Sequence, residues 1–95
     1  MIKTKAKGTR SEKKAIKLLE ATGWYCVRSA GSFGLFDIIA IHPRIPYVRC
    51  IQVKTNKKAS KGEIELIKEF PLPRNFVKEL WVFVDYEREP LIEYL

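Results

Sequence analysis

Acidic residues are scarce in the first two thirds of this 95-residue chain, where only Glu12, Glu20 and Asp37 occur before residue 62. The same stretch holds 14 Lys and Arg residues and so carries a net charge of +11, whereas residues 62–95 carry −4. A charge that served solubility alone would not separate in this way. The distribution therefore favours a polyanionic partner and singles out the three early carboxylates.

Cysteine and histidine are also rare, because Cys26, Cys50 and His42 are the only ones in the sequence. Two cysteines so far apart predict buried free thiols rather than a disulfide framework, and a single histidine does not make a zinc site. The sequence has no phosphate-binding glycine loop, no signal segment and no apolar run of membrane-spanning length. We expect an intracellular protein of the cytoplasm, associated with the nucleoid if it is cellular.

The length predicts one domain over residues 1–95, with a sheet and one or two helices around a single core. Residues 1–7 carry Lys3, Lys5 and Lys7 and predict a flexible basic arm, which either lies on phosphates or stays in solvent. Helical periodicity covers residues 9–21 and 62–70, and strand patterns cover residues 24–29, 36–41, 47–54, 80–86 and 91–94. This order, αβββαβ(β), predicts an α/β fold with a mixed central sheet flanked by helices.

A carboxylate and a cation come together in the predicted hairpin of the second and third strands. If its turn is centred between residues 44 and 45, paired residue numbers sum to 89, and Asp37 faces Gln52. Lys54 shares that face because strand side chains repeat every second residue, and Ile51 and Val53 point to the opposite face. Asp37, Gln52 and Lys54 are therefore predicted to converge at one end of the hairpin.

These residue types suit a divalent cation and a phosphodiester. Mg²⁺ takes oxygen ligands, which the Asp37 carboxylate, the Gln52 side chain and the Val53 carbonyl would supply. Lys54 would orient a water molecule or offset charge on the phosphate, and Glu12, in the first turn of the first helix, would hold a metal-bound water. The alternatives are that Gln52 and Lys54 form the solvent end of a strand, and that Glu12 serves the helix N-terminus or pairs with a basic neighbour.

Aromatic residues and a basic run offer further readings. Strand-like alternation favours core or dimer packing for the aromatic residues, and stacking on bases is the alternative. They are Trp24, Tyr25, Trp81, Phe83 and Tyr86. The Lys57-Lys58-Ala59-Ser60-Lys61 run follows the proposed site and predicts a phosphate clamp.

Several stretches taken together resemble the archaeal Holliday junction resolvases, which belong to the PD-(D/E)XK nuclease superfamily. The similarity covers roughly residues 7–58 in order, spacing and residue type. It rests on Lys7-Gly8-Thr9-Arg10-Ser11-Glu12, Lys17-Leu18-Leu19-Glu20, Gly23-Trp24, Val27-Arg28-Ser29-Ala30-Gly31-Ser32, Asp37-Ile38-Ile39-Ala40 and Ile51-Gln52-Val53-Lys54.

The resemblance implies roles for single residues. Asp37 and Lys54 take the roles of metal ligand and catalytic lysine, Glu12 that of the helix carboxylate, and Arg28 that of a DNA-contacting arginine near the scissile phosphate. Together with charge, it predicts DNA contacts from Lys7, Arg10, Lys13, Arg28, Ser29, Ser32, Lys57, Lys58 and Lys61. It also implies a homodimer with two divalent-metal sites that cuts four-way DNA junctions.

The sequence departs from the resolvase pattern at two positions. Gln52 stands where the family usually has Glu, which removes one negative charge from the metal site, and Phe36 stands where the superfamily name has Pro. We predict an endodeoxyribonuclease that uses Mg²⁺ or Mn²⁺, acting on branched DNA. A nuclease-fold module that binds nucleic acid without turnover is one alternative, a basic RNA-binding domain of ribosomal type is another, and nicking, homing or repair endonucleases fit the same pattern.

Overall fold

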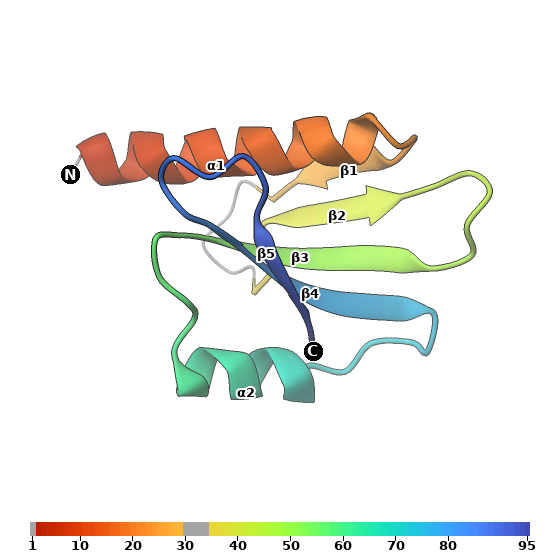
Figure 1. Ribbon diagram of the computed structural model, residues 1–95. Helices are drawn as coiled ribbons and strands as arrows, with labels where there is room; N and C mark the ends of the chain where they lie inside the picture. The colour runs from red at the N-terminus through yellow and green to blue at the C-terminus, as the bar shows by residue number, and fades with distance from the viewer. Residues whose placement is uncertain (1, 30–34) are drawn as a thin grey trace.

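The computed structural model describes residues 2–29 and 35–95, with side chains from Arg10 onward within those ranges. Over these ranges, one five-stranded sheet has its strands in chain order and is accompanied by two helices (Figure 1). The elements are α1 (Ile2–Glu20), β1 (Tyr25–Arg28), β2 (Ile38–Ile41), β3 (Val48–Thr55), α2 (Lys61–Glu69), β4 (Phe76–Phe83) and β5 (Leu91–Tyr94). Their order confirms the predicted α/β fold.

The sheet combines antiparallel and parallel pairs. Strands β1, β2 and β3 form an antiparallel meander, β4 lies parallel to β3 after the α2 crossover, and β5 returns antiparallel to β4. In the β2–β3 hairpin, Ile38 pairs with Ile51, Ile39 with Cys50 and Ala40 with Arg49. Each pair sums to 89, so the predicted register is confirmed.

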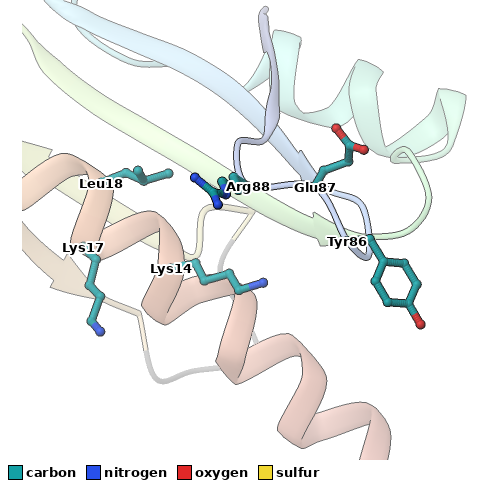
Figure 2. Close-up of a pocket in the computed structure, with 6 residues that line it drawn as sticks. All are labelled: Lys14, Lys17, Leu18, Tyr86, Glu87 and Arg88. Atoms are coloured by element: carbon teal, nitrogen blue, oxygen red, sulfur yellow. The ribbon is translucent and has the colours of Figure 1, made fainter.

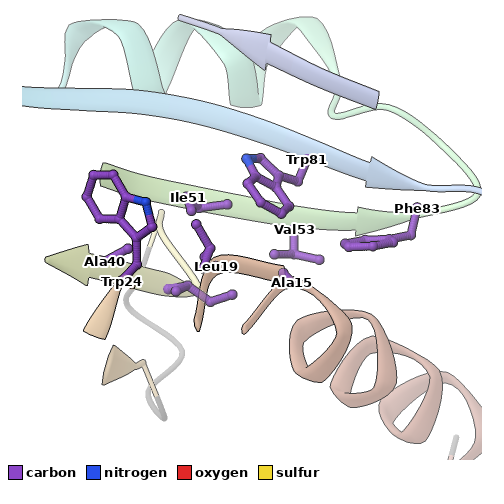
Figure 3. Packing of buried hydrophobic residues seen from close by; sticks show 9 residues of the cluster. Ala15, Leu19, Trp24, Ala40, Ile51, Val53, Trp81 and Phe83 are labelled. Atoms are coloured by element: carbon purple, nitrogen blue, oxygen red, sulfur yellow. The ribbon is translucent and has the colours of Figure 1, made fainter. Parts of the chain in front are cut away.

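The two helices cover opposite faces of the sheet. Ile51 and Val53 of β3 pack with Ala15 and Leu19 of α1, whereas the intervening Cys50 packs with Ile67 of α2 and with Phe36. The cluster on the α1 face is the larger one (Figure 3). It comprises Ala15, Leu19, Trp24, Ile38, Ala40, Ile51, Val53, Trp81 and Phe83.

The first helix begins earlier than its sequence pattern predicts. Its backbone is helical from Ile2, whereas the sequence pattern predicts a flexible arm over residues 1–7 and a helix only from residue 9. Met1 lies outside the described residues. Lys and Ala are good helix formers, which allows the helix to extend through Gly8 although a mid-helix glycine costs about 1 kcal/mol. The sequence does not indicate this early start because Ile2 and Ala6 are the only apolar residues before Gly8, too few for a helical stripe.

Gly23 follows the end of α1 and lets the chain turn toward β1. Gly23 has φ +93°, a left-handed conformation that glycine adopts without strain. A Cβ at this position would also come within 2.8 Å of His42 Nε2. No helix within the described residues is long and apolar enough to cross a membrane.

The second helix starts from a capping box. The Ser60 side chain accepts from the N–H of Glu63, and the Glu63 carboxylate accepts from the N–H of Ser60. This satisfies two otherwise unpaired donors of the first turn. Ile67 is buried, whereas Phe70, at the C-cap, is exposed.

Strand β4 begins four residues before its predicted start. The sequence pattern missed this start because the charged residue Glu79 lies within the strand and is buried. Glu79 is fully buried, and it accepts two hydrogen bonds from Arg49, at 2.7 and 2.8 Å, and one from Trp81 Nε1 at 2.8 Å. The Arg49 guanidinium lies 4.9 Å from the Trp24 ring centroid and 5.7 Å from that of Trp81. The carboxylate is thereby satisfied where an unpaired charge would be prohibitive.

The buried aromatic residues confirm the predicted packing role. Trp24, Trp81 and Phe83 lie in the core of the α1 face. Tyr25 and Tyr86 are instead exposed. Cys26 and Cys50 are free thiols, and burial raises the pKa of both.

Candidate active site

Asp37 lies just before β2, where two hydrogen bonds join it to β3 and a third joins it to Ser29 after β1. Its N–H donates to the Ile51 carbonyl and its carbonyl accepts from the Ser29 N–H, both at 2.8 Å. Its carboxylate Oδ2 accepts from the Val53 N–H at 2.8 Å. This bond to the Val53 N–H places the Asp37 carboxylate against the Gln52-Val53-Lys54 stretch of β3.

The environment of Asp37 disfavours its negative charge. Partial burial is the largest effect and raises the pKa of the carboxyl above its ordinary value, and the Glu12 carboxylate raises it further. The Val53 N–H, Lys54 and Arg28 lower the pKa without cancelling the rise. A cation bound at this carboxylate would recover the free energy that its ionisation costs.

Lys54 is held on the α2 side of β3, where Gln52 also lies because side chains alternate along a strand. Its Nζ donates to Oε2 of Glu63 at 2.8 Å, and the Lys54 side chain is 22% exposed. This hydrogen bond is the main cause of the lowered pKa of the Glu63 carboxyl. Lys54 is therefore fixed against the N-terminal turn of α2 instead of extending into solvent.

Glu12 and Arg28 form the ion pair that joins α1 to β1. Arg28 Nε lies 2.9 Å from Glu12 Oε1, and the two side chains are 43% and 20% exposed. Both groups also act on Asp37, since each changes the pKa of its carboxyl. Glu12 thus pairs with a basic neighbour, which was one of the two alternatives for this residue. It also lies close enough to Asp37 to raise the pKa of that carboxyl.

The partition of charges at the site is uneven. Lys54 has Glu63 as its partner and Arg28 has Glu12, whereas the Asp37 carboxylate has the neutral Val53 N–H. Among the residues that the structure describes, no basic side chain forms an ion pair with Asp37. Asp37 is consequently the site carboxylate whose charge has no cation at contact distance.

A pair of hydroxyl groups anchors α1 to the end of β3. Ser11 is 4% exposed, and its Oγ lies 2.7 Å from Thr55 Oγ1. Ser11 precedes Glu12 and Thr55 follows Lys54 in the sequence. This contact therefore sets the position of the helix carboxylate relative to the strand lysine.

The oxygen-bearing residue types of Asp37 and of the β3 stretch beside it suit a hard divalent cation that keeps several waters. One carboxylate, the Gln52 amide oxygen and a backbone carbonyl are oxygen ligands of the kind that Mg²⁺ takes. Within the described part of the chain, no group of three His, Cys, Asp or Glu side chains is placed to hold a metal ion.

The predicted DNA contacts are mostly exposed. Arg28 lies at the site, next to Ser29, whose N–H binds the Asp37 carbonyl. Lys58 also borders a cleft of about 300 Å³ with Leu80, Val82, Leu91, Ile92 and Glu93. The exposed candidates are Arg10, Lys13, Arg28, Ser29, Lys57, Lys58 and Lys61, whereas Ser32 and the side chain of Lys7 lie outside the described residues.

Glu63 and Ser11 are the site residues that the sequence did not indicate. The spacing Ser60-Lys61-Gly62-Glu63 matches a capping box, and this signal identifies Glu63 as a first-turn carboxylate. Its contact with Lys54 depends on how α2 packs, which no local pattern specifies. The bond from Ser11 to Thr55 likewise joins residues 44 positions apart.

Known proteins resemble this chain over most of its length. The family model described as archaeal Holliday junction resolvase (Hjc) matches residues 3–92. The similarity thus extends on both sides of the stretch, residues 7–58, that carries the recognisable motifs. No curated protein matches the sequence.

A solved structure agrees in fold. The Holliday junction resolvase Hjc from the archaeal hyperthermophile Archaeoglobus fulgidus superimposes with a TM-score of 0.68 and 25% sequence identity. The match covers 94% of this chain and 71% of that protein. The chain belongs to the archaeal Holliday junction resolvase family and carries the nuclease function of that family.

Proposed function

We propose that this resolvase hydrolyses phosphodiester bonds of four-way DNA junctions with Mg²⁺, for which Mn²⁺ substitutes, and that it acts as a homodimer. The observation that carries the proposal is the Asp37 carboxylate, which is held by the Val53 N–H and forms no ion pair with any described basic side chain. Its raised pKa means that a divalent ion there relieves an existing electrostatic cost. Family membership supports the junction as substrate.

Asp37, the Gln52 side-chain oxygen and the Val53 carbonyl would hold the metal. A bound divalent ion supplies Lewis-acid polarisation of the phosphodiester and lowers the pKa of a bound water. The chain's own contribution is position, because the Val53 N–H orients the Asp37 carboxylate. A fixed carboxylate spends less free energy on ordering when the ion arrives.

Lys54 and Arg28 supply the positive charge. The Lys54 ammonium, oriented by Glu63, donates to a phosphate oxygen or to the attacking water. Arg28 binds the neighbouring phosphate with the guanidinium N–H groups that do not donate to Glu12. The basic residues Arg10, Lys13, Lys57, Lys58 and Lys61, with Lys7, Ser29 and Ser32, extend this contact along the DNA backbone.

A DNA-binding module without turnover is the second candidate, and Gln52 is the observation that favours it. A neutral amide in place of a carboxylate weakens metal binding, and a sufficiently weak site would bind DNA but not cut it. The two functions separate on metal-dependent cleavage.

The decisive assay compares a labelled four-way junction with a linear duplex of matched sequence in Mg²⁺, Mn²⁺ or EDTA. We expect paired symmetric cuts on the junction, lost in EDTA and reduced at least about a hundredfold by Asp37→Asn, since removing even a supporting group of a metal site costs 10–100-fold. Cutting of both DNAs would retain the nuclease and remove the junction preference. Tight binding of the junction without cutting in either metal would contradict the enzyme and favour the binding module.

The raised pKa of Asp37 predicts how the stability of the metal-free protein depends on pH. Because the folded protein binds the Asp37 proton more tightly than the unfolded chain, this group favours folding most below about pH 4, and that contribution is lost as pH rises through the folded pKa. Asp37→Asn should therefore raise the melting temperature at pH 7 in EDTA, and the gain should shrink toward pH 4. Thermal unfolding followed by circular dichroism, with the exposed Glu20→Gln as control, measures this. A lower melting temperature for Asp37→Asn at every pH would contradict it.

Gln52 predicts weak metal binding in the absence of DNA. Gln52→Glu should tighten Mn²⁺ binding at least about fivefold, because even in bulk water two unit charges 4 Å apart attract by about 1 kcal/mol. Titration with Mn²⁺ followed by electron paramagnetic resonance measures the change. Glu63→Gln, which removes rather than adds a charge nearby, is the control and should not tighten binding. Equal affinity of wild type and Gln52→Glu would remove Gln52 from the ligand set.

The Lys54–Glu63 ion pair predicts a positioning role for Glu63. Glu63→Gln keeps a side chain suited to the capping box but loses the charge that holds Lys54. We expect kcat to fall about 10–100-fold, as for other groups that orient a catalytic residue, with junction affinity and melting temperature close to wild type. Glu65→Gln, an exposed carboxylate of the same helix, serves as control. A wild-type kcat in Glu63→Gln would show that the ion pair is incidental to cleavage.

A further inference from the structure

A cleft of about 410 Å³ lies between α1 and the loop that joins β4 to β5. Figure 2 shows Lys14, Lys17 and Leu18 on the helix and Tyr86, Glu87 and Arg88 on the loop, with Arg88 on the side toward the helix. Positions three and four apart share one side of a helix, so Lys14, Lys17 and Leu18 form a continuous wall. The site residues described above do not line this cleft.

The cleft is positive and its cations have no partner among the described residues. Lys14, Lys17 and Arg88 are exposed, and within the described chain no ion pair or side-chain hydrogen bond engages them. Glu87 is the one acidic residue of the lining. Three cations without internal partners, set around one cavity, suit an anionic ligand that makes several contacts.

The remaining lining is apolar and aromatic. Leu18 is 39% exposed at the helix wall, and Tyr86 is fully exposed. Tyr86 has φ +72°, a left-handed conformation that is strained for a residue with a side chain. The cost is maintained although the ring makes no core contact, and the ring projects away from the loop (Figure 2).

The loop is anchored where it leaves the sheet. Asn56, which follows β3, donates through Nδ2 to Asp85 Oδ2 at 2.9 Å, and its Oδ1 accepts from the Asp85 N–H at 2.8 Å. The Glu87 N–H then donates to the Val84 carbonyl at 3.0 Å. These bonds fix the residues before and after Tyr86, so the ring is presented from a defined turn.

The cleft and the active site occupy opposite flanks of α1. Glu12 pairs with Arg28 of β1, whereas Lys14, Lys17 and Leu18 face the β4–β5 loop. Residues 12 and 14 are about 200° apart around a helix with 3.6 residues per turn. Between the two flanks, Ser11 fixes the helix on Thr55 of β3. A ligand that reaches both must cross α1.

We propose that this cleft is a second DNA-binding site, in which Lys14, Lys17 and Arg88 contact backbone phosphates and Tyr86 stacks on an unpaired or end-exposed base of the junction. The inference rests on the proposed function, since it takes branched DNA as the ligand. Cationic grooves that carry an exposed aromatic residue suit nucleic-acid strands whose bases lack a stacking neighbour. The branch point of a four-way junction offers such bases, and a linear duplex offers them only at its ends.

The test measures binding of a labelled four-way junction and a circularly closed duplex by fluorescence anisotropy, in EDTA and between 50 and 200 mM salt. For Lys14→Gln/Lys17→Gln/Arg88→Gln, the slope of log affinity against log salt should become shallower by about 2.7, which corresponds to three lost phosphate contacts. Tyr86→Gly removes the ring and suits the positive φ, so a folding defect does not account for its effect. It should weaken junction binding about tenfold and duplex binding much less.

The control, Arg44→Gln/Lys68→Gln/Arg74→Gln, removes the same charge from exposed positions away from the cleft. A salt slope for the cleft variant equal to that of this control would overturn the phosphate contacts, and equal loss on junction and duplex in Tyr86→Gly would overturn the base contact. Failure of the wild type itself to bind or cut the junction would contradict the proposed function instead.

Discussion

The register of the β2–β3 hairpin is the constraint on which the site depends. Burial of Ile51 and Val53 against α1 forces Gln52 and Lys54 toward α2, because the side-chain period of a strand is two. A slip of one residue would expose the apolar pair and bury the lysine, so the core enforces the chemistry. Asp37 strengthens the same register, since its carboxylate binds the Val53 N–H where regular pairing ends. The same register that buries the core residues of β3 therefore also positions the candidate site residues.

The two buried or partly buried carboxylates, Glu79 and Asp37, differ in how the protein pairs their charge. The fully buried Glu79 has bidentate Arg49 and the Trp81 indole N–H, so its charge is matched inside the protein. Asp37 is only partly buried, yet it receives a single neutral donor, and the neighbouring cations are committed to other carboxylates. A protein optimised for stability alone would pair Asp37 as it pairs Glu79. The pKa of the Asp37 carboxyl, raised mainly by partial burial, reflects this lack of an internal partner.

Local patterns predicted those features that depend on periodicity, and tertiary packing decided the rest. The register of the β2–β3 hairpin and the burial of Trp24 follow from strand alternation, and the structure confirms both. The helical start of α1 was missed because residues 2–8 have no apolar stripe, and the start of β4 because Glu79 interrupts one. Glu63 was recognised as part of a helix but not as the partner of Lys54, since that contact depends on how α2 packs on the sheet.

The segregation of charge along the sequence serves the fold as well as the partner. Two acidic residues of the C-terminal third neutralise cations of the basic part: Glu79 binds Arg49, and Glu63 binds Lys54. Both cations thereby acquire fixed positions on β3, one in the core and one at the site. Exposed cations on the outer side of α1, such as Lys14 and Lys17, form no ion pair with an acidic residue in the described chain, so their charge is not neutralised within it. The basic surplus is therefore concentrated on surfaces that a polyanion can reach, because the acidic residues nearest the sheet are occupied with holding it together.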